Sequence, residues 1–302
     1  MLRAFAVSRT DRVRSLQSRY TKGMSTFSIF IRLLLLLPAT VLAFGPGLAS
    51  AESASCIESN ASEADFPNSL VVNVNGESEG LVAAWYDGAT TRYRHGVLGD
   101  EIEAGELHVI TNRNGEQCAQ RLVLSNEEVF EDLAPRLVDM DGDGEMDVVA
   151  VVSHRSLGAR LGVFGHENGN DLLKLKAATP NIGTAYRWLA PIGTGDFDED
   201  GLMDVAFIDR PHLAQVLRVF SYHPENGLTE TAAKPGFTNH RIGEDFISSG
   251  VRLCGGRTQL ITVGPDWDRI LATTLNDGKL TTEDFGAFDG IDSIRAALEC
   301  AN

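Results

Sequence analysis

The sequence lacks the signatures of several common enzyme classes. It has no HExxH zinc pair and no GKS or GKT loop to cradle a phosphate, and its seven histidines are scattered singly along the chain. Zinc-protease and phosphate-loop chemistry are therefore not expected. Long helices are also missing from the pattern, because no segment repeats its apolar residues with the 3.6-residue period of an amphipathic helix.

Basic residues are scarce, and the acidic excess is concentrated after the first sixth of the chain. The 302 residues include 26 Lys or Arg and 42 Asp or Glu. The first 51 residues hold seven of the basic residues and one of the acidic residues, so residues 52–302 carry a formal charge of −22. Such a surface repels nucleic acid and anionic lipid, and it attracts divalent cations.

The first 51 residues have the order of a secretory leader. Basic residues are followed by the apolar run FSIFIRLLLLLPATVLAF and then by GLASAES, and cleavage is predicted between Ala51 and Glu52. Arg32 and Pro38 leave about a dozen uninterrupted apolar residues, short of the roughly 20 that cross a bilayer. We therefore expect a secreted or periplasmic monomer, residues 52–302, with no membrane span after cleavage. Translation starts either at Met1 or at Met24.

Four cysteines follow the predicted cleavage site, and none belongs to a CxxC pair: Cys56, Cys118, Cys254 and Cys300. An even number of cysteines in an exported chain favours two disulfides over metal ligation. Three pairings are open on this count alone.

The remainder of the chain contains an internal repeat. GEMDVVAVV at residues 144–152 aligns with GLMDVAFID at residues 201–209, at an offset of 57, and fainter copies lie upstream and downstream. Each copy consists of short runs rich in Val, Ile, Leu and Phe, separated by Gly, Asn and Asp turns, which is typical of strands. Four strands per repeat predict an all-β fold, a small β-propeller of four four-stranded blades; five blades are the alternative.

The predicted blades cover residues 69–121, 136–178, 192–233 and 251–285. SIRAAL, residues 293–298, is left over, and it is predicted to be a further inner strand that closes the ring on the first blade, because unpaired blades expose sheet edges. Cys254 and Cys300 would then each end the first strand of a repeat in adjacent blades, and Cys56 and Cys118 would tie the N-terminal segment to the first blade. These two pairings are favoured, with other pairings still open.

Two loops of the repeats carry a regular acidic pattern, DMDGDGEMD and DFDEDGLMD. Alternate residues of a tight loop point the same way, so their carboxylates converge, and the glycine at position 6 permits the sharp turn. The predicted ligands of the first loop are Asp139, Asp141, Asp143, the carbonyl of Glu145 and Asp147. Those of the second loop are Asp196, Asp198, Asp200, the carbonyl of Leu202 and Asp204.

Calcium is the predicted occupant, with one ion in each loop. It takes about six to eight oxygen ligands, whereas magnesium demands stricter geometry and retains its water. An EF-hand needs a glutamate at position 12, where this chain has Ala150 and Phe207. A β-hairpin calcium loop is therefore predicted instead.

The pattern DxDxDGxxD between two strands, at an interval near 57 residues, resembles the FG-GAP or VCBS repeat, the blade of integrin-α-like propellers. The stretch VFGHENG, residues 163–169, echoes the FG-GAP signature itself. The resemblance implies an exported bacterial β-propeller in which calcium ions are structural and bind between the first and second strands of a blade. It also implies that ligands meet the opposite face.

The loops after the second strand of each repeat are expected on that opposite face. They combine acids, arginines and aromatic residues, which suit a polar ligand such as a peptide, a sugar or an acidic group. The candidate ligand-binding residues are Asp87, Arg155, Asp209, Arg210, His212, Asp266, Trp267 and Arg269. The predicted function is a binding or adhesion module for an unknown protein or glycan. The alternative is a secreted hydrolase or lyase using Asp, His and Arg on this face, for which no catalytic residue can be assigned.

Overall fold

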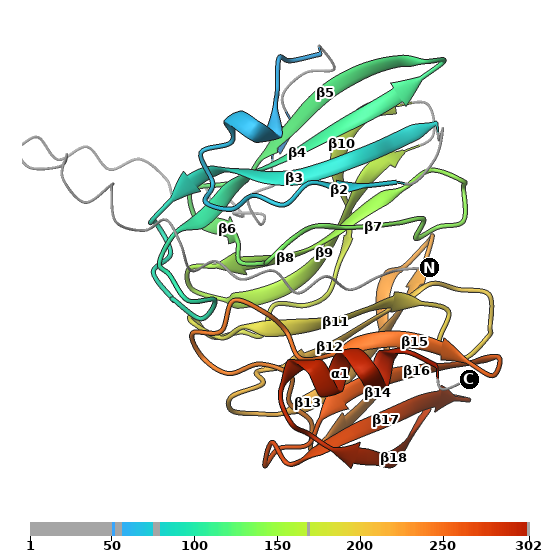
Figure 1. The fold of residues 1–302 in the computed structure, drawn as a ribbon. Coiled ribbons are helices and arrows are strands. Elements are labelled where there is room, and N and C mark those ends of the chain that lie inside the picture. The colour runs from blue at the N-terminus through green and yellow to red at the C-terminus, as the bar shows by residue number, and fades with distance from the viewer. Residues whose placement is uncertain (1–49, 52–55, 75–78, 168–169, 301–302) are drawn as a thin grey trace, which may run out of the picture.

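The computed structural model describes residues 50–51, 56–74, 79–167 and 170–300. These residues form antiparallel sheets, with one α-helix and one short 3-10 helix among them, so the predicted all-β class is confirmed (Figure 1). Most of the predicted leader lies outside the described residues. Its last two residues form β1 (Ser50–Ala51), which pairs with β5. In the described part of the chain, no helix has the length and apolar character needed to cross a membrane.

All described strands except β1 and β6 (Glu128–Phe130) group, in chain order, into four antiparallel units of four. The first two units contain β2 (Val72–Asn73), β3 (Gly80–Thr90), β4 (Glu103–Arg113) and β5 (Glu116–Val123), then β7 (Arg136–Val138), β8 (Asp147–His154), β9 (Gly158–Glu167) and β10 (Asn170–Ala178). The next two contain β11 (Leu189–Gly195), β12 (Asp204–Asp209), β13 (Val216–His223) and β14 (Gly227–Pro235), then β15 (Gly250–Cys254), β16 (Arg257–Val263), β17 (Arg269–Asn276) and β18 (Lys279–Ala287). These units coincide with the four repeats found in the sequence.

A short strand joins the first two units. β6 pairs with β4 through Ala104 and Phe130, and with β8 through Val129 and Ser153. The first and second units thereby belong to one ten-stranded sheet, whereas the third and fourth units are separate four-stranded sheets.

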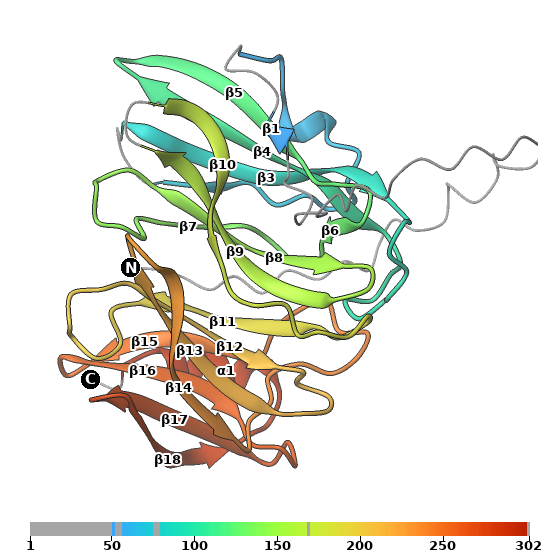
Figure 2. The same cartoon turned by 180° about the vertical axis from the view of Figure 1, so that it is seen from behind.

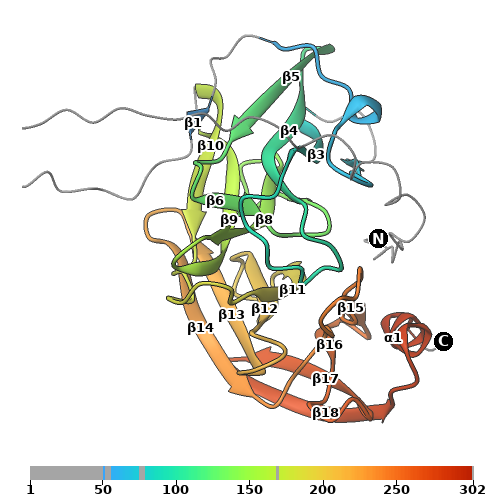
Figure 3. The same cartoon turned by 90° about the vertical axis from the view of Figure 1, so that its left-hand side faces the viewer.

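The cores lie between successive units, which explains why the second strands of the two middle units, β8 and β12, are apolar apart from their ends. In β8, Val148, Ala150 and Val152 pack against the first unit. The alternate residues Val149 and Val151 belong to the cluster shared with the third unit. Side chains of a strand alternate between its two faces, so a sheet buried on both faces needs a continuous apolar run rather than an alternating one. The units follow one another along a curved arc, which Figures 2 and 3 show from two further sides.

The C-terminal segment corrects one prediction. SIRAAL, residues 293–298, is not an inner strand but most of helix α1 (Ile291–Leu298). Ile291, Ile294 and Leu298 recur at spacings of three and four, which places them on one helical face. That face packs on the fourth unit, with Ile294 and Ala297 buried against apolar residues of β16 and β17. The segment therefore covers the outer face of the last unit and forms no ring-closing pair.

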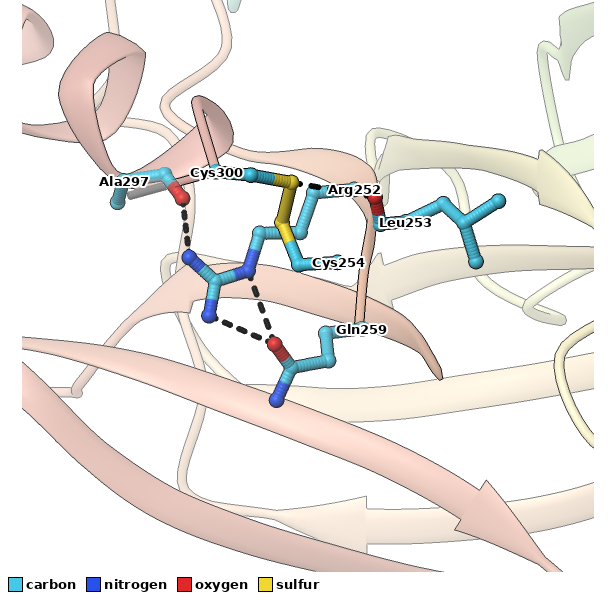
Figure 4. The surroundings of a disulfide bond; sticks show 6 residues. All are labelled: Arg252, Leu253, Cys254, Gln259, Ala297 and Cys300. Atoms are coloured by element: carbon cyan, nitrogen blue, oxygen red, sulfur yellow. Dashed lines mark hydrogen bonds between the residues drawn. A yellow bond between two sulfur atoms is a disulfide. The ribbon is translucent and has the colours of Figure 1, made fainter. Parts of the chain in front are cut away.

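Each end of the arc is tied by a disulfide. Cys254, at the end of β15, bonds to Cys300 just beyond α1, and Arg252 donates from Nη1 to the carbonyl of Ala297 over 2.6 Å (Figure 4). At the other end, Cys56 bonds to Cys118 of β5, beside a backbone hydrogen bond from Ile57 to Ala119. These are the two pairs favoured from the sequence, although Cys300 follows a helix and does not end a strand.

Candidate metal-binding loops and the opposite rim

The first acidic loop connects β7 to β8. Gly142 and Gly144 have positive φ angles of 73° and 91°, a backbone conformation that favours glycine. Their amides donate to the carboxylate of Asp139 over 2.8 and 2.9 Å. The carboxylate at position 1 therefore organises the loop around its own backbone.

The second acidic loop connects β11 to β12 and repeats this geometry. The carboxylate of Asp196 accepts from the amides of Asp200 and Gly201 over 3.1 and 3.0 Å, and Gly201 has a φ of 87°. Both loops lie at the same end of their units, the right-hand edge in Figure 1. The spacing that the sequence repeats thus produces the same turn twice.

Carboxylate oxygens converge in each loop, but the participating residues differ. Oxygens of Asp139, Asp141 and Asp143 lie within 4.8 Å of one another in the first loop. In the second loop the group is Asp196, Asp198 and Asp204. The ninth-position aspartate joins the cluster only in the second loop.

The second loop fits a cation well. Oδ1 of Asp198 is buried without a hydrogen-bond partner. Burial and the nearby carboxylates of Asp200 and Asp196 raise the pKa of Asp198. Among the described residues, no salt bridge involves Asp196, Asp198 or Asp200. An unpaired buried carboxylate oxygen is costly unless a positive charge compensates it, so this donor set has the chemistry of a hard-cation site.

The ninth-position aspartates, Asp147 and Asp204, begin β8 and β12. Both are buried, and desolvation raises the pKa of each to about 6. Oδ2 of Asp147 accepts from the Met140 amide, and Oδ2 of Asp204 accepts from the Phe197 amide, over 3.2 and 2.9 Å. Each aspartate therefore pins its loop to its strand in the same way.

The remaining oxygen of these aspartates meets different partners. Lys176 donates to Oδ1 of Asp147 over 2.9 Å and to Oδ2 of Asp141 over 2.6 Å. In the second loop, the hydroxyl of Ser221 donates to Oδ1 of Asp204. A full positive charge thus lies in the first loop, and a neutral hydroxyl takes its place in the second.

The side chain of Glu145 points away from the first loop, toward the first unit. Arg113 donates to both of its carboxylate oxygens and lowers its pKa. Leu202 holds the equivalent place in the second loop. The ligands predicted at these two positions are backbone carbonyls. The ion pair of the Glu145 side chain therefore does not test that prediction.

The predicted ligand-binding residues do not gather into one cluster at the opposite end of the units. Asp209 is buried at the end of β12, where its carboxylate accepts from Arg210 over 2.7 Å and from Arg218 over 3.0 Å. Arg155 pairs with Glu127, and the exposed Arg269 pairs with Asp284. These contacts hold each residue to its own or the neighbouring strand.

The other candidates are also divided. Trp267 stacks under the guanidinium of Arg241, 4.0 Å from the ring centre, and Asp266 beside it is exposed. Asp87 instead lies on the outer face of the first unit, in a cavity of about 630 Å³ between that face and residues 57–63. His108 shares this cavity and bonds to Glu106 through Nε2 over 2.8 Å.

The structure brings together a polar group of which the sequence analysis named only His212. His212 meets His240 over 3.1 Å, and His95 bonds through Nδ1 to the fully buried Glu131 over 2.6 Å. The indole of Trp188 donates to the carbonyl of Glu131. His95, Glu131 and His240 belong to no sequence motif. Their loops are distant in the sequence and adjacent in space.

Aromatic side chains lie beside this group, since Tyr93 and Tyr186 both contact the ring of His95. Tyr93 stacks on Tyr186 with ring centres 5.1 Å apart, and the Tyr186 amide donates to the Tyr93 hydroxyl over 3.0 Å. Four large apolar side chains on the loops at this end are exposed, namely Leu157, Tyr186, Leu213 and Ile242. We refer to these four residues as the exposed rim.

Comparison with known families agrees with the repeat. Residues 139–207, which include both acidic loops, match the family model of an FG-GAP-like repeat. No curated protein matches the chain. The matched segment runs from the first acidic loop into β12 and crosses the boundary between the second and third units, so this part of the chain is similar to an FG-GAP-like repeat.

Proposed function

We propose that this FG-GAP repeat protein is an exported, calcium-stabilised β-propeller-like module that binds a protein or glycan ligand. The observation that carries the proposal is the second acidic loop. Its carboxylates converge on one point, and one of their oxygens is buried without a partner. Calcium suits such a set because it accepts several carboxylate and carbonyl oxygens in flexible geometry.

Calcium has a structural role in this proposal. The acidic loops lie where the first strand of a unit turns into the buried second strand, and they are held to it by Asp147 and Asp204. An ion that neutralises such a loop lowers the repulsion among carboxylates next to an apolar core. Extracellular sites of this type bind at about 10⁻⁴–10⁻³ M, so millimolar calcium stabilises the fold by about 1 kcal/mol for each occupied site.

The exposed rim is the proposed ligand-binding face. It lies at the end of the units opposite the acidic loops, on loops that interlock: the amide of Gly243 donates to the carbonyl of Val97, and the Tyr186 amide donates to Tyr93. Rigid loops that present aromatic and apolar side chains beside histidines suit recognition of a protein or sugar surface. Secretion and an adhesion role belong to this proposal together with the predicted leader.

A binding screen tests the proposal. The labelled, calcium-loaded protein is applied to arrays of glycans and extracellular proteins, beside a variant with Leu213→Ser and Ile242→Ser. These side chains are 66% and 72% exposed, so their replacement leaves the fold intact. Binding that the wild-type protein shows and the variant loses supports the exposed rim. Equal binding by both proteins contradicts it.

The enzymatic alternative receives less support from the geometry. Its most plausible acid, Asp209, is neutralised by Arg210 and Arg218, and His212 is hydrogen-bonded to His240. A general base must reach a substrate proton. Turnover of polysaccharide or lactone substrates that disappears in His212→Gln would restore this alternative.

A further inference from the structure

We propose that Lys176 is a built-in counter-ion that replaces calcium in the first acidic loop, so that the chain binds one calcium ion, in the second loop. The inference rests on the proposed function, since it takes the second loop as the calcium site. It departs from the two equivalent ions that the repeat resemblance implies.

The position of Lys176 carries the argument. Its ammonium bridges Asp141 and Asp147, over 2.6 and 2.9 Å, and its side chain is only 5% exposed. An ammonium that bridges two carboxylates in this way places a positive charge within the loop.

A glycine makes room for this side chain. Gly165 lies opposite Asp147 in the β8–β9 pair, as the neighbouring Val148 and Phe164 register shows. A Cβ atom on Gly165 would lie 1.9 Å from Oδ1 of Asp147 and 2.9 Å from Cδ of Lys176. Any larger residue at this position would thus displace the bridge.

The second loop has the complementary pair of residues. Ser221 lies opposite Asp204, in the place of Gly165, and supplies a hydroxyl. Both fourth strands bulge at the next position, where β10 has Lys176 and β14 has Thr231. Thr231 donates to the carbonyl of Val219 and carries no charge. Gly165 and Lys176 of the second unit therefore correspond to Ser221 and Thr231 of the third unit.

The consequence for metal binding is direct. A calcium ion in the first loop would need oxygens of Asp141 and Asp147 that already accept from the ammonium, and the two positive charges would repel each other. Asp147 does not join the converging carboxylates, whereas its counterpart Asp204 does. The first loop thus already holds a positive charge between two of its carboxylates, whereas no ion pair of the described residues supplies one in the second loop.

Calorimetric titration of the purified, calcium-stripped protein with calcium chloride tests this inference. The wild-type protein is expected to bind one ion, and Asp198→Asn none. Lys176→Met is expected to gain a second site with a dissociation constant of about 10⁻⁴–10⁻³ M. The double variant Lys176→Met, Asp198→Asn then binds one ion, in the first loop. Lys176→Arg, which keeps the charge, is the matched control and retains a single site.

A second variant keeps the inference testable if Lys176→Met does not fold. Gly165→Ser combined with Lys176→Thr copies the second loop into the first, and it is also expected to bind two ions. A wild-type stoichiometry of two overturns the inference, as does a folded Lys176→Met protein that still binds one. If neither the wild-type protein nor any variant binds calcium, the proposed calcium function itself fails, a result distinct from both.

Discussion

His212 donates a hydrogen bond from Nε2 to Nδ1 of His240 over 3.1 Å. The direction follows from the second contact of His240, whose Nε2 lies 2.9 Å from the carbonyl of Glu244 and must be the donor there. His240 is fully buried and packs edge-on against Trp188, with ring centres 4.8 Å apart. This direction requires a neutral His240, the form that its burial favours.

This requirement predicts acid sensitivity. Burial lowers the pKa of His240 from 6.5 to about 4, so below pH 6.5 the unfolded chain takes up a proton that the folded chain refuses. The stability contribution is complete above pH 6.5 and is lost progressively down to pH 4, a total of about 3 kcal/mol. Urea denaturation between pH 7 and pH 4 measures it.

The matched control is His240→Gln, which keeps hydrogen-bonding groups and does not titrate. Asp147 and Asp204 titrate in the same range in both proteins, so the difference between the two curves isolates His240, apart from the smaller contribution of His212. Parallel curves for the wild-type protein and the variant would contradict the assignment.

Removal of the C-terminal disulfide should destabilise the last unit. Cys254 and Cys300 are 46 residues apart, and closing a loop of that length limits the entropy of the unfolded chain. The double variant Cys254→Ser, Cys300→Ser is expected to lose about 2–4 kcal/mol of unfolding free energy. Equal denaturation midpoints of the oxidised wild type and the variant would refute this.

Ile294 tests the role of α1 as a cover. It is 1% exposed against the apolar residues of the fourth unit, and Ile294→Ala should cost about 2–4 kcal/mol through lost contacts and a cavity. The exposed Asp292→Ala, on the same helix, is the control and should change stability by less than about 0.5 kcal/mol. Similar effects of both substitutions would mean that α1 does not pack as described.

Asp209 and Arg269 separate structural from exposed charges. Asp209→Ala leaves Arg210 and Arg218 without the carboxylate they share, and we expect a loss of about 2–4 kcal/mol. Arg269→Ala removes a pair between exposed side chains, which solvent screens, and should leave the melting temperature nearly unchanged. Thermal melts of both variants check the contrast, and a destabilising Arg269→Ala with a silent Asp209→Ala would reverse it.

Much of the fold could be predicted because its information is local. The repeat offset, the apolar runs and the Gly and Asp turns fixed the four units and the positions of both acidic loops. The prediction for the C-terminal segment was wrong because a stretch of six residues, four of them apolar, fits either period. The expectation of a closed ring outweighed the helical spacing of Ile291, Ile294 and Leu298. The favoured cysteine pair was right although its stated reason, two adjacent first strands, was wrong for Cys300.

The functional features that escaped prediction depend on contacts between distant segments. Lys176 is one of five lysines in the chain and follows the first acidic loop by about 30 residues. No local motif marks it, and only the β10 bulge brings it to Asp147. His240 and Glu131 carry no motif, and only loop packing brings them beside His212 and His95. The arginine partner of Asp209 on β13 is likewise a product of strand register.

The central claim is that calcium in an acidic loop stabilises this fold, and the most direct measurement is a calorimetric melt with millimolar calcium and with excess EGTA. We predict that calcium raises the melting temperature of the wild-type protein by about 2–4 °C, the shift expected from about 1 kcal/mol in a chain of this size. Asp198→Asn should show no such shift. Identical melting curves of the wild-type protein in calcium and in EGTA would contradict the account.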